Sequence, residues 1–256
     1  MFLHSLLASF RRQRHLSGMA NLQTNSALKT VALFGLVCLA VANCGPSIND
    51  AAKSDIDRRV AALRNGGPAF TGPLGFAPKP LAVGQWTTFK MTDEDKKPSF
   101  LTHKITGQQG NAFWFETTSE TYYGKTTTAI LLDPGDRTNP ASMDIQAVKT
   151  KDADGRVNEM PKEMLGLMRS MWQQSLAVLV VTWEGKPQED ASVPGGTFAQ
   201  CFKAKTDAAW GPFKSSSMVW AHSEVPISGT VKTEGLDKPF SMELVQFGES
   251  GAKSDF

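Results

Sequence analysis

The chain has 256 residues, of which 41% are hydrophobic and 20% are charged, and this composition is typical of a globular protein. Its formal net charge is +2, but four of its 27 Lys and Arg residues and none of its 25 acidic residues precede Cys44, so the chain from Cys44 onward is near −2. This balance predicts no basic surface for nucleic acid, and three cysteines are too few for a disulfide scaffold or a cysteine-rich zinc site.

The first feature along the chain is an uncharged run, TVALFGLVCLAVA, over residues 30–42 after Lys29. A membrane-spanning helix needs about 20 apolar residues, so this run is too short to span and fits the apolar part of a signal peptide. We therefore interpret residues 1–43 as a signal peptide and expect the protein to be exported. Met19 is the expected start of translation, because it gives a leader of more usual length than Met1 does.

The run ends in LAVANCG (39–45), which can be cut in two ways. Ala40-Val41-Ala42 is a small-x-small site for general signal peptidase, which would release the protein. The stretch Val41-Ala42-Asn43-Cys44 instead resembles a bacterial lipobox, although Asn43 departs from the usual small residue. That resemblance implies diacylglycerol on the Cys44 thiol, cleavage before Cys44, and a membrane as partner through the lipid anchor. Gly45 resembles the residue that follows the cysteine in lipoproteins sent to the outer membrane.

Residues 44–80 are expected to form a lipid-anchored tether with one short helix. Ser54 is the predicted N-cap, Ile56 lies on the apolar face, and Asn65-Gly66-Gly67 ends the helix. Four prolines in residues 68–80 predict an extended segment that stands the following domain away from a bilayer.

Residues 81–256 are predicted to form a single β-rich domain. Runs of β-branched and aromatic residues between turn signals predict an antiparallel meander. The expected strands are 85–91, 101–106, 112–122, 126–132, 145–151, 196–205, 216–222, 228–233 and 241–247. Phe113 and Phe115 are expected on one face of their strand with Trp114 on the other, so both faces there should be covered.

Between these strands, residues 161–177 change to helical spacing after Pro161. The methionines of this stretch make a soft apolar surface. It is either a helix packed across the sheet or a wall of a pocket for acyl chains. The candidate pocket residues are Met164, Leu167, Met168, Met171 and Trp172, together with Phe113 and Phe115.

The last part of the chain contains VPGGTF, MVWAHSEVPISGTVK and MELVQFG. These stretches resemble the final strands of uncharacterised bacterial envelope proteins with a half-barrel related to the lipoprotein carriers LolA and LolB. The resemblance covers about the last 65 residues. It implies an α+β fold, mostly antiparallel β, in which a curved meander sheet is crossed by one main helix.

The sequence offers little catalytic chemistry. His103 and His222 are the histidines beyond the leader, and Cys201 is the cysteine of the predicted body. A Cys201–His222 nucleophile pair is conceivable, but no motif marks an acid to orient it, and no metal-ligand spacing, phosphate loop or cofactor motif is present. We therefore expect no catalytic residues, no metal and no cofactor.

Three functional hypotheses follow from the sequence. The first is a non-enzymatic envelope lipoprotein that binds an apolar ligand or an envelope protein. The second is a structural or interaction component of an envelope complex, with a core filled by its own side chains. The third, an enzyme, has the least support.

Overall fold

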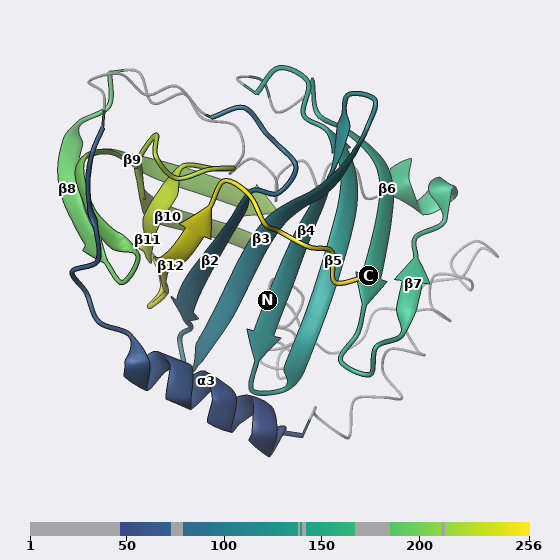
Figure 1. Cartoon of the computed structure of the whole chain (residues 1–256), viewed down its shortest axis with the longest axis horizontal. Coiled ribbons are helices and arrows are strands. Elements are labelled where there is room, and N and C mark those ends of the chain that lie inside the picture. The colour runs from purple at the N-terminus through teal and green to yellow at the C-terminus, as the bar shows by residue number, and fades with distance from the viewer. Residues whose placement is uncertain (1–46, 73–78, 138, 140–141, 167–184, 211–212) are drawn as a thin grey trace, which may run out of the picture. The chain divides into compact units, whose positions relative to one another are not determined.

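The computed structural model describes residues 47–72, 79–137, 139, 142–166, 185–210 and 213–256. The chain divides into residues 1–48 and a folded body over residues 49–256. Over the described residues, the body is a mostly antiparallel sheet of twelve strands together with helix α3 (Figure 1). The elements are α3 (Asp50–Ala62), β1 (Ala69–Thr71), β2 (Trp86–Thr92), β3 (Pro98–Gln109), β4 (Ala112–Thr121), β5 (Gly124–Asp133), β6 (Asp144–Lys151), β7 (Val157–Glu159), β8 (Gln188–Val193), β9 (Gly196–Trp210), β10 (Phe213–Ala221), β11 (Thr230–Gly235) and β12 (Ser241–Gly248).

The sheet joins the two ends of the body. Its order is β1-β9-β10-β11-β12-β2-β3-β4-β5-β6-β7, and β8 pairs with β9 outside this path. β12 pairs with β2, with Met242 opposite Met91, so the last strand lies beside the first long strand. The β1–β9 pair is parallel, which makes the sheet mixed.

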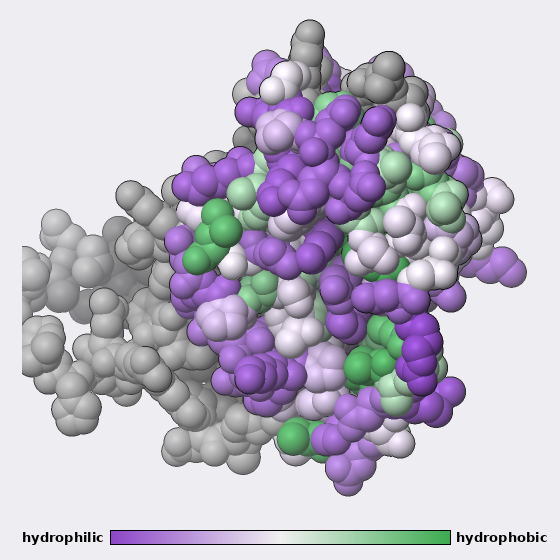
Figure 2. Space-filling view, turned by 90° about the vertical axis from the view of Figure 1, so that its left-hand side faces the viewer, coloured by the Kyte–Doolittle hydropathy of each residue, from purple (hydrophilic) through white to green (hydrophobic). Residues whose placement is uncertain are grey.

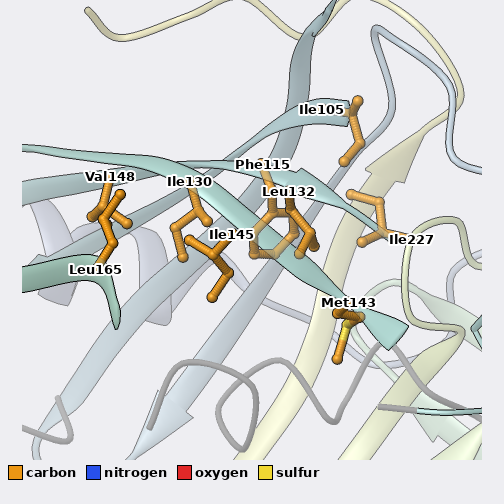
Figure 3. Close-up of a cluster of buried hydrophobic side chains, with 9 residues drawn as sticks. All are labelled: Ile105, Phe115, Ile130, Leu132, Met143, Ile145, Val148, Leu165 and Ile227. Carbon is orange, nitrogen blue, oxygen red and sulfur yellow. The ribbon is translucent and has the colours of Figure 1, made fainter. Parts of the chain in front are cut away.

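Alternation along β2–β6 produces one apolar face. The cross-strand pairs Ile105–Phe115 and Phe115–Ile130 place large side chains next to one another on this face. They belong to a cluster that draws on β3–β6 and on Ile227 from the β10–β11 loop (Figure 3). A second cluster, around Phe89, Phe198 and Leu244, links β2 with β9 and β12. Burial of these side chains at about 25 cal/mol per Å² is the main force that holds the sheet together.

The Ile227 backbone has φ of 67°, a left-handed conformation that is rare for a β-branched residue. Its side chain is buried in the first cluster, and its carbonyl accepts a hydrogen bond from the Arg137 guanidinium at 2.5 Å. Arg137 also donates to the Lys79 carbonyl at 2.5 Å. These contacts join three loops and offset the backbone strain at Ile227.

Helix α3 begins at Asn49, five residues before the predicted cap at Ser54. The Asn49 side chain accepts a hydrogen bond from the Ala52 N–H at 3.0 Å, and the helix ends at Leu63, before the predicted glycine stop. The prediction of Ser54 as the cap is therefore wrong, because a better cap stands one turn earlier. α3 and β1 lie within the predicted tether, and both contact the sheet.

Residues 162–166 are helical, in agreement with the start of the helix expected at 161–177. Residues 167–184 lie outside the described residues, so the helix that was expected to cross the sheet stays a prediction. Figure 2 views the side that carries β8, where hydrophobic residues form separate small areas among hydrophilic ones. The described residues of this side therefore present no broad apolar surface.

Candidate functional site: a polar sheet face holding the closing segment

The face of β2–β6 opposite the apolar clusters is polar. Alternation places Lys104 of β3 and Glu116 of β4 on this face, directly opposite each other, while their neighbours Ile105 and Phe115 point into the core. Thr118 of β4 faces Thr127 of β5, and their hydroxyl groups are 3.1 Å apart. Around Lys104 and Glu116, the sheet therefore carries charged and hydroxyl groups on one face and the first apolar cluster on the other.

Helix α3 covers one end of this polar face. Arg59 donates to Glu120 Oε2 at 3.0 Å, and its guanidinium lies 3.8 Å from the ring centroid of the buried Phe100. The Tyr122 hydroxyl donates to Asp57 Oδ1 at 2.7 Å. These contacts fix the helix on the ends of β3 and β4 and leave the rest of the polar face to another part of the chain.

Residues 249–256, which we call the closing segment, lie on the rest of the polar face. The segment leaves β12 and runs across β3, β4 and β5 (Figure 1, yellow). Lys104 Nζ donates to the Lys253 carbonyl at 3.2 Å, and Lys151 Nζ donates to the Asp255 carbonyl at 2.7 Å. The Ala252 N–H donates to the Gly84 carbonyl at 2.9 Å. The sheet thus holds the closing segment through its main chain as well as through its side chains.

Gly84 permits this close approach. Its φ is +101°, and a Cβ built there would lie 3.1 Å from Ser250 Cα. Trp86 Nε1 then donates to the Ser250 carbonyl at 3.2 Å. A glycine is therefore needed at the point where the closing segment joins the face.

Asp255 is the most strongly held side chain of the closing segment. Its Oδ2 accepts hydrogen bonds from Lys104 Nζ at 2.7 Å and Thr118 Oγ1 at 2.8 Å, and its Oδ1 accepts from Lys125 Nζ at 3.2 Å. Burial opposes ionisation of the Asp255 carboxyl, but the hydrogen bonds from Lys104 and Thr118 and the Lys104 charge outweigh it and lower the pKa to about 2. We call Lys104, Lys125 and Lys151 the three-lysine site.

Glu116 of β4 also binds the closing segment, from the polar face on which the segment lies. Its side chain is 1% exposed, and its carboxylate accepts hydrogen bonds from Thr106 Oγ1 at 2.8 Å, Ser254 Oγ at 2.5 Å and the Asp255 N–H at 3.0 Å. A buried carboxylate is costly unless it is hydrogen-bonded. Two of these three donors come from the closing segment, so its docking and the burial of Glu116 depend on each other.

Two pockets flank Asp255. One of 210 Å³ is lined by Lys125, Thr127, Lys151, Asp152, Ala153, Gly155 and Asp255. The other, of 310 Å³, is lined by Trp86, Thr102, Lys104 and residues 251–255. The closing segment therefore does not fill the polar face, and the unfilled space adjoins lysine side chains on both sides.

The sequence analysis did not identify this site. The alternation of Thr102, Lys104 and Thr106 in one strand and of Glu116 and Thr118 in the next was the available signal. Asp255 carries no such signal, because it reaches the site only through the path of the closing segment.

The predicted pocket residues lie elsewhere or outside the described structure. Phe115 belongs to the first apolar cluster (Figure 3), and Phe113 packs against it, as alternation predicted. Met164 is 45% exposed, whereas the adjacent Leu165 packs into the cluster. Leu167, Met168, Met171 and Trp172 lie outside the described residues. A role of these seven residues in ligand binding stays a prediction.

The apolar face carries two buried polar atoms without a hydrogen-bond partner. Thr87 Oγ1 and His103 Nδ1 belong to side chains that oppose each other across β2 and β3. The His103 ring lies between the rings of Phe89 and Phe115, with centroids 5.7 and 5.3 Å away. Burial lowers the pKa of His103 to about 4, so the imidazole is neutral at pH 7.

Cys201 and His222 do not form a hydrogen-bonded pair in the described structure. The Cys201 thiol is a buried free thiol that donates to the Phe198 carbonyl at 3.6 Å, and burial raises its pKa to about 12. His222 Nδ1 accepts from the Glu224 N–H at 3.2 Å, and burial lowers the pKa of this imidazole. A thiol with so high a pKa is a poor nucleophile.

The described residues contain no group of three or more His, Cys, Asp and Glu side chains placed to hold a metal ion. Within the same part of the chain, no helix has the length and apolar character needed to cross a membrane.

No protein-family model matches this sequence, and no curated protein matches it. A crystal structure with some similarity is that of a Bacteroides fragilis NCTC 9343 protein that is inferred to be exported and has a YmcC-like fold. The two chains are 12% identical with a TM-score of 0.34, over 66% of this chain and 98% of the other. A likeness of this size establishes neither family nor function, so the proposals below rest on the residues of this chain.

Proposed function

We propose that this protein is an exported, lipid-anchored and non-enzymatic envelope protein that acts as an interaction component, binding an extended polypeptide segment on the polar face of β2–β6. The observation that carries the binding role is the closing segment itself, which lies on this face through hydrogen bonds to its main chain and to Asp255. A surface that holds one extended segment through its backbone and an acidic side chain has the chemistry to hold another.

The export and anchoring parts of the proposal rest on the leader and on Cys44, with the outer membrane as the expected location. Mass spectrometry of the mature N-terminus tests them. A mass that includes acyl chains on Cys44, lost in Cys44→Ala, is the expected result. A mature chain that begins at Asn43 without acyl mass would overturn the anchor.

The absence of catalysis is supported by the chemistry of the described Cys and His side chains. The high pKa of the Cys201 thiol disfavours the thiolate that a nucleophile needs, and each buried imidazole is disfavoured as a cation.

The binding role is tested with a chain that stops after Gly248 and a fluorescein-labelled peptide of the closing segment, ESGAKSDF. We expect saturable binding to the shortened chain in fluorescence anisotropy. Binding to the full chain should be at least about tenfold weaker, because the attached segment competes at an effective concentration on the order of millimolar. Circular dichroism checks that the shortened chain is folded. A folded shortened chain that does not bind the peptide would refute the binding role.

A second candidate function is the binding of an apolar ligand on the opposite face, which would use the half-barrel curvature of LolA-like carriers. The specific observation in its favour is the pair of unpartnered atoms, Thr87 Oγ1 and His103 Nδ1, among aromatic rings. Leaving such atoms unpaired costs about 1–3 kcal/mol each, which a ligand hydroxyl or a water would recover. Native mass spectrometry of the protein from its producing cells should then show a bound apolar molecule that is lost in His103→Phe; an unliganded wild-type protein would count against this function.

A further inference from the structure

We propose that the three-lysine site recognises an aspartate or glutamate carboxylate on an extended acidic segment of a partner protein, and that Asp255 occupies the site as an internal competitor. This inference rests on the proposed function and specifies the partner that the polar face takes.

The first argument is the convergence of cations. Ammonium groups from β3, β5 and β6 all bond to Asp255, two of them to its carboxylate and one to its carbonyl. If Asp255 leaves, Lys104, Lys125 and Thr118 lose their shared acceptor, while Glu116 and Glu120 remain on the same face, the latter bonded to Arg59. The nearby Asp152 accepts hydrogen bonds from the N–H groups of Asp154 and Arg156 in its own turn. A replacing carboxylate restores the charge-assisted hydrogen bonds, and a neutral amide does not.

The second argument is unfilled space beside the carboxylate. Both pockets have Asp255 as a common wall, and each is lined by lysine side chains. The closing segment itself contributes Lys253, whose side chain is exposed next to the pocket that contains Lys104. An acidic residue at this position in a partner would be attracted to the site, whereas Lys253 is repelled by it.

The third argument is that the closing segment is removable. Lys253 and Ser254 are exposed, and Asp255 is half-buried. The two large apolar clusters draw their members from the sheet, its loops and residue 165, and none comes from residues 249–256. The segment can therefore leave the polar face without dismantling the hydrophobic core.

The test uses the full chain carrying Asp255→Asn and synthetic peptides with acetylated and amidated ends. Isothermal titration calorimetry compares ESGAKSDF, its Asp-to-Asn form ESGAKSNF, and the more acidic ESGAESDF. We expect ESGAKSDF to bind Asp255→Asn at least tenfold more tightly than it binds the wild type. On the same variant, ESGAKSNF should bind at least tenfold more weakly than ESGAKSDF, and ESGAESDF should bind most tightly.

A second substitution tests the role of the lysine. In Lys104→Gln combined with Asp255→Asn, the difference between the Asp and Asn peptides should fall below threefold. The matched control is Lys205→Gln combined with Asp255→Asn, because Lys205 pairs with Asp207 on β9, away from the polar face, and this variant should keep the full difference.

Three outcomes would overturn the proposal. Equal binding of ESGAKSDF and ESGAKSNF to Asp255→Asn would remove carboxylate recognition but leave peptide binding in place. Complete competition by millimolar acetate or phosphate would indicate a site for small anions and not for a partner segment. Failure of every peptide to bind Asp255→Asn and the shortened chain alike would remove the proposed function together with this inference.

Discussion

Lys104 Nζ and Asp255 Oδ2 lie 2.7 Å apart although the two residues are separated by 151 positions in the chain. The Lys104 side chain is 16% exposed and that of Asp255 is 22% exposed, so this ion pair is shielded from much of the solvent. A shielded, hydrogen-bonded pair contributes more than an ion pair at the surface.

We therefore expect Lys104→Gln and Asp255→Asn to be coupled. Each substitution should lower the free energy of unfolding by about 1–2 kcal/mol, and the double variant should lose less than the sum of the two. Urea unfolding of the four proteins measures this coupling. Additive losses would mean that the pair contributes no energy of its own.

The acid stability of the protein should depend on His103. The folded-state pKa of about 4 lies below the ordinary value of 6.5, so the unfolded chain takes up the proton first as the pH falls. The contribution of His103 to the free energy of unfolding is therefore fully present above pH 6.5. It falls by about 3 kcal/mol as the pH drops from 6.5 to 4. In His103→Phe, this part of the pH dependence of the urea midpoint should disappear. An unchanged profile would show that His103 does not titrate in this window.

Asp255 should act in a separate and more acidic window. Its folded-state pKa of about 2 lies below the ordinary 3.8, so the stability it adds is present above pH 3.8 and is lost as the pH falls toward 2. Comparing wild type with Asp255→Asn from pH 5 to pH 2 should show the two urea midpoints converging. A constant difference over this range would contradict the charged contacts of the closing segment.

Gly72 should be intolerant of a side chain. A Cβ at this position would lie 2.5 Å from His222 Nε2, and the His222 side chain is buried. We expect Gly72→Ala to lower the free energy of unfolding by about 1–3 kcal/mol. Most of that loss should be recovered when the substitution is made in a His222→Ala background, as measured by urea unfolding. The same loss in both backgrounds would place the strain somewhere other than the imidazole.

Cys201 should be unreactive in the folded protein. Its side chain is buried and its thiol pKa is raised to about 12, so little thiolate forms at pH 8. A thiol reagent such as dithionitrobenzoate should react with Cys201 at least a hundredfold faster in 8 M urea than in buffer. Rapid reaction of the native protein would indicate that β8 and β9 open readily.

The nine strands expected from the sequence are all present. Alternating β-branched and aromatic residues indicated their positions, because the apolar side chains on one face of each strand pack into the core. β1 and β7 were missed because Ala69–Thr71 and Val157–Glu159 are too short to show a period, and the partner of β1, β9, lies far along the chain. β8 was missed because Gln188–Asp190 is polar and exposed, so its hydrogen bonds and not its side chains define it.

The candidate site was less predictable than the fold for a physical reason. Lys104 and Glu116 become neighbours through strand register, which alternation indicates only in part. Asp255 joins them because Gly84 admits the backbone of the closing segment, and no local pattern in the sequence encodes that contact.

The Asn49 N–H donates to the Tyr122 carbonyl at 2.8 Å, so the chain is fixed to the sheet at the first residue of the body. Only five residue steps separate Asn49 from Cys44, and an extended chain spans about 3.5 Å per step. A lipid-bearing Cys44 would therefore lie at most about 17 Å from Asn49, at the N-terminal end of α3. The orientation of the body above a bilayer would then be restricted by covalent geometry, and partners would meet it from the sides and the far end.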